Sequence, residues 1–196
     1  YLVEEEKTVF FTFGRMNPPT TGHEKLMNEL AKKSGKNQYK IFLSQSEDKK
    51  KNPLPYQEKV KMVRKFFPKH ARQVILDKKI KSVFDVATRL FNEGYKNLTM
   101  VVGSDRVMEF NTLLNKYNGV KSRHGLYNFN RINTISAGER DPDADDVSGM
   151  SASKMRKVAA EGNFSQFTQG LPRSVSNAEA KKAYNQVRKG MGLKEV

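Results

Sequence analysis

The sequence contains no cysteine among its 196 residues. Disulfides, thiolate catalysis and cysteine-based zinc sites are therefore excluded, and the absence agrees with a reducing compartment. No apolar run approaches the length of about 18 residues that a membrane-spanning helix requires. No secretory signal is visible, although the chain begins with Tyr1 rather than Met. We therefore expect a cytoplasmic protein with no membrane partner.

Two familiar glycine loops are also missing. The chain contains neither G-x-x-x-x-G-K-[ST] nor G-x-G-x-x-G, the phosphate-binding loops of P-loop and dinucleotide-binding folds. Acidic residues are scarce: 21 Asp and Glu stand against 36 Lys and Arg, which gives a formal charge of +15. Such an excess indicates either a solvated surface that keeps the protein soluble or contact with nucleic acid or another polyanion. Both interpretations are compatible with an enzyme.

What the sequence does contain is an alternation of strand and helix patterns. Short apolar runs predict five strands, at residues 9–13, 39–43, 74–76, 98–102 and 132–135. Apolar residues spaced by three and four predict helices at residues 21–33, 56–67, 82–92 and 105–117, then one capped by Ser151 and one at 176–188. This order predicts an α/β fold, a doubly wound Rossmann-like parallel sheet of about five strands with an added C-terminal helix.

The most informative segment is residues 12–23, which reads Thr-Phe-Gly-Arg-Met-Asn-Pro-Pro-Thr-Thr-Gly-His. A strand stops at Gly14, the chain passes a Pro-Pro turn, and a helix begins with a capping box at Thr21. The loop therefore brings backbone N–H groups, the Arg15 guanidinium and the His23 imidazole to a helix N-terminus, which already favours anions. We interpret this loop as a phosphate site.

Residues 14–23 resemble the first signature of the nucleotidylyltransferase superfamily, G-x-F-x-P-x-[HT]-x-G-H. Residues 150–156, Met-Ser-Ala-Ser-Lys-Met-Arg, resemble the second signature, I-S-S-T-x-x-R. Residues 52–59 and 101–105 resemble the N-P-F-x-x-x-E-R and G-x-D segments of its adenylyltransferases, with Lys59 where they have Arg. The resemblance covers about residues 8–160. It is nearest to nicotinamide-mononucleotide and pantetheine-phosphate adenylyltransferases.

The resemblance implies a nucleotidyltransferase with a Rossmann-like domain at residues 1–170, and residues 171–196 as a basic helical extension of that domain. Such an enzyme transfers a nucleoside monophosphate, here AMP in preference to CMP, from ATP or CTP to a phosphorylated small-molecule acceptor and releases pyrophosphate. The triphosphate would bring Mg²⁺ with it. The reaction needs groups that position the phosphates and stabilise the charge that grows on their oxygens.

Three residues are the expected catalytic groups: His23, Thr20 and Arg156. His23 would donate a hydrogen bond to a phosphate oxygen at the α–β bridge, and Thr20 would add a hydroxyl donor. Arg156, one turn into its helix, can engage a phosphate through two hydrogen bonds. A lone His at a helix start more often satisfies a turn, but the signature around His23 favours the catalytic role.

The remaining site residues are expected to bind the nucleotide and its phosphates: Gly14, Arg15, Met16, Gly22, Gly103, Asp105, Ser151 and Ser153. Glycine lets the backbone approach a ligand closely, and serines at a helix N-terminus offer hydroxyl and N–H groups. Each has a structural alternative as a loop glycine, an exposed arginine or a helix cap. The acidic residues Asp141, Asp143, Asp145 and Asp146 lack the spacing of a calcium loop, so we interpret them as a solvated turn and expect no metal site.

Two other functions stay open at this point. A binding or structural module could retain the nucleotidylyltransferase fold and use its basic surface, above all the last helix, to hold nucleic acid or an assembly partner. A fragment of a class I aminoacyl-tRNA synthetase is a weaker hypothesis. Its H-I-G-H and K-M-S-K-S signatures resemble those above, but nothing in this sequence provides a tRNA-reading domain.

Overall fold

The protein is described by a computed structural model that covers residues 6–138 and 150–194. Within these residues the chain forms two compact units. The first unit comprises residues 6–13, Leu26–Phe42 and 77–138. The second comprises Gly14–Lys25, Leu43–Leu76 and residues 150–194. Each unit is thus assembled from separate stretches of the sequence.

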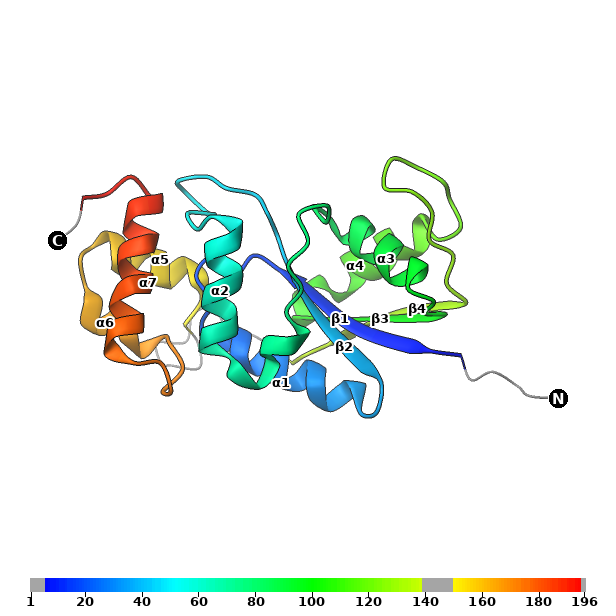
Figure 1. Ribbon diagram of the computed structural model, residues 1–196, viewed down its shortest axis with the longest axis horizontal. Coiled ribbons are helices and arrows are strands. Elements are labelled where there is room, and N and C mark those ends of the chain that lie inside the picture. The colour runs from blue at the N-terminus through cyan, green and yellow to red at the C-terminus, as the bar shows by residue number, and fades with distance from the viewer. Residues whose placement is uncertain (1–5, 139–149, 195–196) are drawn as a thin grey trace. The chain divides into compact units, whose positions relative to one another are not determined.

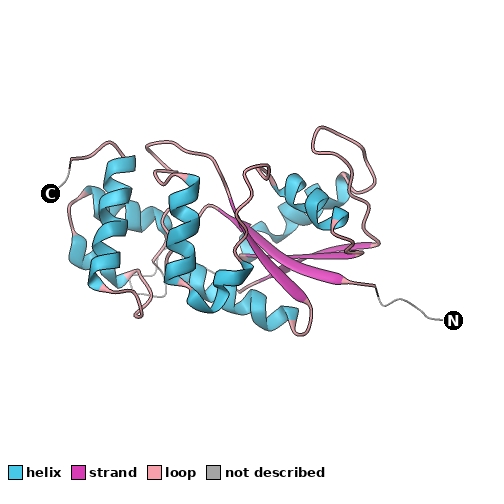
Figure 2. Ribbon diagram, in the orientation of Figure 1, coloured by secondary structure: helices cyan, strands magenta, loops and turns pink. Residues whose placement is uncertain are grey.

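The first unit is built on a sheet of four strands, drawn in magenta in Figure 2. The strands are β1 (Thr8–Gly14), β2 (Gln38–Leu43), β3 (Asn97–Val102) and β4 (Arg131–Ser136), in the order β2-β1-β3-β4. β1 and β4 both pair in parallel with β3. Buried apolar residues such as Val9, Phe11 and Val101 make these strands suitable for a sheet covered on both faces.

Helices cover both faces of this sheet. They are α1 (Thr21–Ser34), α3 (Val83–Asn92) and α4 (Val107–Lys116). The chain moves from β1 outward to β2, and then back across β1 to β3 and β4. Right-handed crossovers therefore place α1 on the face opposite to α3 and α4, as Figure 1 shows.

The second unit is helical. It contains α2 (Tyr56–Phe66), α5 (Ala152–Ala160), α6 (Phe164–Gln169), α7 (Asn177–Gly190) and a 3₁₀ helix η1 at Pro68–Gln73. Figure 1 shows α5, α6 and α7 side by side, and Met155, Phe167 and Tyr184 are buried among them. A Cβ on Gly190 would collide with the Pro53 carbonyl, so glycine is required where the end of α7 contacts the segment before α2.

The structure confirms the α/β class and four of the predicted strands, and it corrects the fifth. Residues 74–76 form no strand. Val74 is buried, and its carbonyl accepts a hydrogen bond from the Arg64 guanidinium at 2.7 Å. Val74 makes only an isolated β-bridge, and a side chain satisfies its carbonyl where the apolar run suggested a sheet ladder.

The predicted helices also form, with α4 beginning at Val107 instead of Asp105. The short helices η1 and α6 were not predicted. Among the residues that the structure describes, no helix has the length and hydropathy needed to cross a membrane.

Candidate functional site

The start of α1 is closed by hydrogen bonds that Thr20 makes with Gly22 and His23. The Thr20 hydroxyl accepts from the Gly22 N–H at 3.2 Å, and the Thr20 N–H donates to Nδ1 of His23 at 3.0 Å. The arrangement resembles a capping box, with His in place of the usual Glu or Gln and with the hydroxyl bonded to the second helical N–H instead of the third. The capping box predicted at Thr21 is therefore wrong by one residue. Thr21 is the first helical residue, and its N–H donates to the Gly170 carbonyl at 2.9 Å.

The hydrogen bond from the Thr20 N–H also determines which nitrogen of the His23 ring carries the hydrogen. A neutral imidazole has one donor and one acceptor nitrogen. Nδ1 receives a backbone N–H, which can only donate, so Nε2 carries the ring hydrogen. The cap therefore makes Nε2–H the donor of the ring, while Nδ1 holds the ring in place.

Asn17 organises the loop of residues 15–20 that joins β1 to α1, here called the signature loop. Its side chain is fully buried. The amide nitrogen donates to the Arg15 carbonyl at 3.2 Å and to Oδ1 of Asn52 at 3.3 Å, and Oδ1 of Asn17 accepts from the Leu54 N–H at 3.0 Å. A buried amide with its donors and acceptor engaged holds the loop against residues 52–54.

The second signature segment meets the first at the same residue. Arg156 of α5 donates from its guanidinium to the backbone carbonyl of Asn17 at 2.8 Å, across 139 positions of sequence. A Cβ on Gly22 would lie 3.7 Å from the Met150 carbonyl, so the first turn of α1 also approaches the residues before α5. The two signature segments therefore meet within the second unit.

Three cationic side chains gather around the signature loop. Arg15 extends from the loop and is exposed, Arg156 is half-buried, and Lys59 of α2 is fully buried. The Lys59 ammonium donates to the Ser44 hydroxyl at 3.3 Å, and the Ser44 N–H donates to the Gly14 carbonyl at 2.9 Å. Lys59 is thereby connected to the residue at which β1 ends.

Burial and the charge of Arg15 lower the pKa of the other two cations of this cluster. Burial, and then the nearby charge of Arg15, lower the pKa of Lys59 to about 7. The same two causes lower the pKa of Arg156. Positive groups held this close together form a region of positive potential, and a bound anion would reduce the repulsion between them.

One carboxylate partly balances the cluster. The pKa of Asp48 is held well below its usual range, first by the Asn52 side-chain amide at 2.8 Å and then by backbone N–H groups such as that of Lys51 at 2.7 Å. Its negative charge acts on Arg156 in the direction opposite to burial. Because Asn52 also bonds to Asn17, the loop of residues 48–52 is tied to the signature loop.

The other predicted residues of the second unit have identifiable structural positions. The Ser151 hydroxyl accepts from the Lys154 N–H at 3.1 Å and caps α5, while Ser153 is exposed in its first turn. Met16 is buried with a positive φ of 45°, a conformation that few residues other than glycine adopt. Ser151 thus serves as a helix cap, and the predicted ligand contacts of these residues stay predictions.

Gly103 and Asp105 lie in the first unit and are not part of this cluster. A Cβ on Gly103 would lie 2.9 Å from Oδ1 of Asp105, a contact that a movement of this side chain can relieve. Asp105 belongs to the 3₁₀ helix η2 (Ser104–Arg106), and Arg106 is the residue that precedes α4. The binding role predicted for Gly103 and Asp105 stays a prediction.

In the described part of the chain, no group of three or more His, Asp or Glu side chains lies close enough together to hold a metal ion. The acidic residues Asp141, Asp143, Asp145 and Asp146 lie outside the described residues. Mg²⁺ brought by a triphosphate therefore stays a prediction from the sequence.

Sequence reasoning missed two members of the site. Asn17 lay inside the first signature but in a variable position, so nothing marked it as the residue that joins three segments. Lys59 was noticed only as a replacement for Arg in residues 52–59. The residues around it carry no signal that it will be buried beside Gly14.

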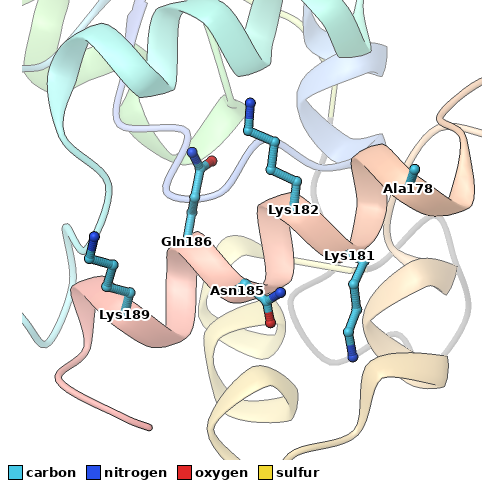
Figure 3. A pocket seen from close by; sticks show the side chains of 6 residues that line it. All are labelled: Ala178, Lys181, Lys182, Asn185, Gln186 and Lys189. Atoms are coloured by element: carbon cyan, nitrogen blue, oxygen red, sulfur yellow. The ribbon is translucent and has the colours of Figure 1, made fainter. Parts of the chain in front are cut away.

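A separate shallow hollow of about 510 Å³ lies along α7. Figure 3 shows Lys182, Gln186 and Lys189 extending to one side of the helix, and Lys181 extending to the other. The Lys181 ammonium lies 4.6 Å from the ring centroid of Phe164, so its charge is engaged by an aromatic face. The hollow therefore presents fewer available charges than the basic sequence of this helix suggests.

Comparison with known proteins identifies the class. A sequence model of the cytidylyltransferase-like family matches residues 11–158, a span that includes both signature segments. The chain belongs to this family, within the nucleotidyltransferase superfamily. The predicted class of protein is therefore confirmed.

A solved structure shares the fold. The crystal structure of TmcAL from Thermotoga maritima, bound with α-thio ATP, matches with a TM-score of 0.52 and 10% sequence identity. The match covers 94% of this chain and 56% of that chain, so this chain spans little more than half the length of that protein. None of the curated proteins compared with the chain matches its sequence significantly.

Proposed function

We propose that this protein transfers a nucleoside monophosphate from a nucleoside triphosphate to a phosphate-bearing acceptor and releases pyrophosphate. The observation that carries the proposal is the meeting of both signature segments at Asn17, with Arg15, Lys59 and Arg156 gathered around it. A triphosphate supplies several negative charges to such a cluster and offsets the repulsion within it. Membership in the cytidylyltransferase-like family supports the same reaction.

The reaction balances as one displacement at phosphorus. An oxygen of the acceptor phosphate attacks the α-phosphorus, the bond from the α-phosphorus to the bridging oxygen breaks, and pyrophosphate leaves with the electron pair. Negative charge grows on the leaving oxygens, where the Nε2–H of His23 and the guanidinium groups of Arg15 and Arg156 stabilise it. The same cations position the triphosphate for in-line attack. Mg²⁺ accompanies the triphosphate as part of the substrate.

We favour AMP as the transferred group, with CMP as the alternative. The Gly-Arg opening at Gly14 and the Asn-Pro pair at Asn52 both resemble adenylyltransferases. The family that matches residues 11–158 takes its name from cytidylyl transfer and supports the alternative. The acceptor that we propose first is nicotinamide mononucleotide, followed by other small phosphorylated compounds.

The test is pyrophosphate release from ATP and CTP, each with a panel of phosphorylated acceptors, by the wild-type protein and the His23→Ala variant. Loss of the Nε2–H donor should lower kcat/KM at least about 100-fold. His124→Ala is the matched control, because His124 lies in the first unit stacked on Phe84 at 5.2 Å, and it should retain activity. Pyrophosphate release by His23→Ala at a near wild-type rate would contradict the mechanism. No release with any pair would contradict the activity.

A second candidate function is to hold nucleic acid or an assembly partner through α7. The observation that favours it is the exposure of Lys182 and Lys189 on one side of that helix (Figure 3). Phosphate contacts of this kind bind without sequence preference and weaken steeply with salt. This function would coexist with the transferase activity, because α7 carries none of the signature residues.

A further inference from the structure

Lys59 is a lysine in an environment that disfavours the charged form of its side chain. It is fully buried, and among the described residues its ammonium hydrogen-bonds only to the Ser44 hydroxyl, at 3.3 Å. No carboxylate of a described residue forms an ion pair with it. A buried ammonium without an anionic partner is costly, and deprotonation is the usual way in which a protein avoids that cost.

The charged groups around Lys59 reinforce this effect. From the signature loop, Arg15 repels its positive charge. From α5, Arg156 is in turn subject to the field of Arg15. On α2 itself, Glu58 is directed to Lys61 at 3.9 Å and to Gln186 at 3.3 Å. Asp48, held by Asn52, raises the pKa of Arg156. It is not among the groups that shift the pKa of Lys59.

A connected path joins Lys59 to the place where we position the polyphosphate. The ammonium donates to Ser44, whose N–H donates to the carbonyl of Gly14, and the signature loop begins at the next residue. An anion held by Arg15 and Arg156 would replace net repulsion at Lys59 with attraction. The protonated form would then become the favoured one.

We infer that Lys59 gains a proton when a polyphosphate binds at the signature loop, so that binding is coupled to pH through a lysine that does not touch the ligand. The inference rests on the proposed function only for the location of the polyphosphate. Lys59 is therefore a positioning residue: its charge would attract the ligand without contact, and Ser44 connects it to Gly14 at the start of the signature loop.

The sign of the coupling follows from the free and bound states. With a pKa of about 7 in the free protein, Lys59 is mostly neutral at pH 8. Binding that restores its charge takes up close to one proton per ligand at that pH. Affinity should therefore fall as pH rises above about 7, by up to about tenfold per pH unit.

The experiment is calorimetric titration of inorganic tripolyphosphate into the full chain at pH 8, in buffers of different ionisation enthalpy. The dependence of the measured heat on the buffer gives the number of protons taken up. We expect the wild type to take up about one proton more than Lys59→Met, which has a side chain of similar length and no charge. Lys59→Arg is the matched charged variant, since a guanidinium stays protonated, and it should bind without the extra uptake.

The outcomes separate a coupled role from a structural one. A merely structural Lys59 would change affinity or unfolding on substitution, but it would leave the proton count of Lys59→Met equal to that of the wild type. That equality would overturn the inference, as would failure of tripolyphosphate to bind the wild type at all. Circular dichroism and thermal unfolding establish that each variant is folded. If Lys59→Arg does not fold, Lys59→Met still decides the question.

Failure of this inference and failure of the proposed function are distinguishable. Proton uptake that depends on Lys59, without pyrophosphate release from any triphosphate, would keep the inference and remove the transferase activity. Pyrophosphate release together with a proton count that is independent of Lys59 would keep the transferase activity and remove the inference about Lys59.

Discussion

The two units bury different kinds of polar side chain. In the first unit, the buried polar residues are the hydroxyl residues Thr12, Ser34, Thr99 and Thr134. In the second unit, they include amides, an imidazole and two cations: Asn17, Asn52, His70, Lys59 and Arg188. A buried hydroxyl can be satisfied by one backbone carbonyl, as the Thr12 hydroxyl is when it donates to the Val101 carbonyl at 2.7 Å. Amides and cations in an interior need partners from several segments, and cost more if those partners are lost.

The two buried cations of the second unit also differ from each other. The Arg188 guanidinium donates to the carbonyls of Ala159 and Lys194, at 2.6 and 2.8 Å, and so ties α7 to the end of α5. Lys59 has a single hydroxyl partner and a repelling neighbour in Arg15. The fold therefore supplies partners for Arg188, while for Lys59 we propose an anion at the site. Violations of packing rules tend to occur at functional sites, and Lys59 is such a case.

The largest effect that would sharpen this comparison is expected from Arg156→Met. It removes the guanidinium that we propose to bind the phosphates, and its hydrogen bond to the Asn17 carbonyl. We expect kcat/KM for pyrophosphate release to fall about 100-fold. Arg89→Met in the first unit is the control, because Arg89 is bonded to Asp77 and Glu93 and should affect only stability. Equal loss of activity in both variants would remove the distinction between the units.

Removal of a buried polar group from each unit should give the next effect. Asn17→Ala leaves the Leu54 N–H and the Asn52 amide oxygen without their partner, and should lower the free energy of unfolding by about 2–3 kcal/mol. Thr12→Val in the first unit should cost about 1 kcal/mol. Denaturant unfolding measures both, and tripolyphosphate affinity should fall only in Asn17→Ala. Equal affinities in the two variants would show that Asn17 does not organise a site.

The pH dependence of stability tests the buried lysine directly. The pKa of Lys59 is lowered on folding to about 7, so the unfolded chain binds more protons above that pH. Stability should therefore rise from pH 7 toward pH 10, by at most about 1.4 kcal/mol per pH unit from this group. Lys59→Met should flatten the rise, measured by denaturant unfolding at several pH values. An unchanged slope would mean that Lys59 is charged in the free protein.

The smallest effect is expected on α7. The double variant Lys182→Glu and Lys189→Glu should weaken binding of a fluorescent oligonucleotide by a few-fold at low salt and leave pyrophosphate release unchanged. Anisotropy titrations at increasing salt measure the binding. Absence of any binding by the wild type at low ionic strength would end the nucleic-acid hypothesis.

Much of the first unit could be predicted from local pattern. Apolar runs marked β1 and β3, because a strand covered on both faces is apolar along most of its length. β2 is apolar only in its second half, and β4 reads Arg-Ile-Asn-Thr-Ile-Ser, in which exposed Arg131 and Asn133 alternate with buried Ile132 and Thr134. The same rule failed at residues 74–76. A run of three apolar residues is too short for a ladder, and the Arg64 side chain satisfies the Val74 carbonyl instead. Helix α6 escaped detection because it has only six residues and follows α5 closely.

The site was predictable only in part. The signatures identified His23, Arg156 and the loop between β1 and α1, because their spacing is tied to a strand–loop–helix turn. They did not show that His23 replaces an acid in the capping box, since Thr20 and Thr21 are equally good caps in sequence. They also did not distinguish Ser151 as a helix cap from Ser151 as a phosphate ligand.

The sequence by itself determined the family, the α/β order and the segments that we propose to carry the chemistry, because these depend on periodicity and spacing along the chain. Only the tertiary structure decided that Asn17 joins residues 52–54 to Arg156, and that Lys59 is buried near Gly14 without a carboxylate partner among the described residues. Both facts depend on which distant segments meet. Local pattern contains no information about the desolvation and like-charge repulsion that such meetings create.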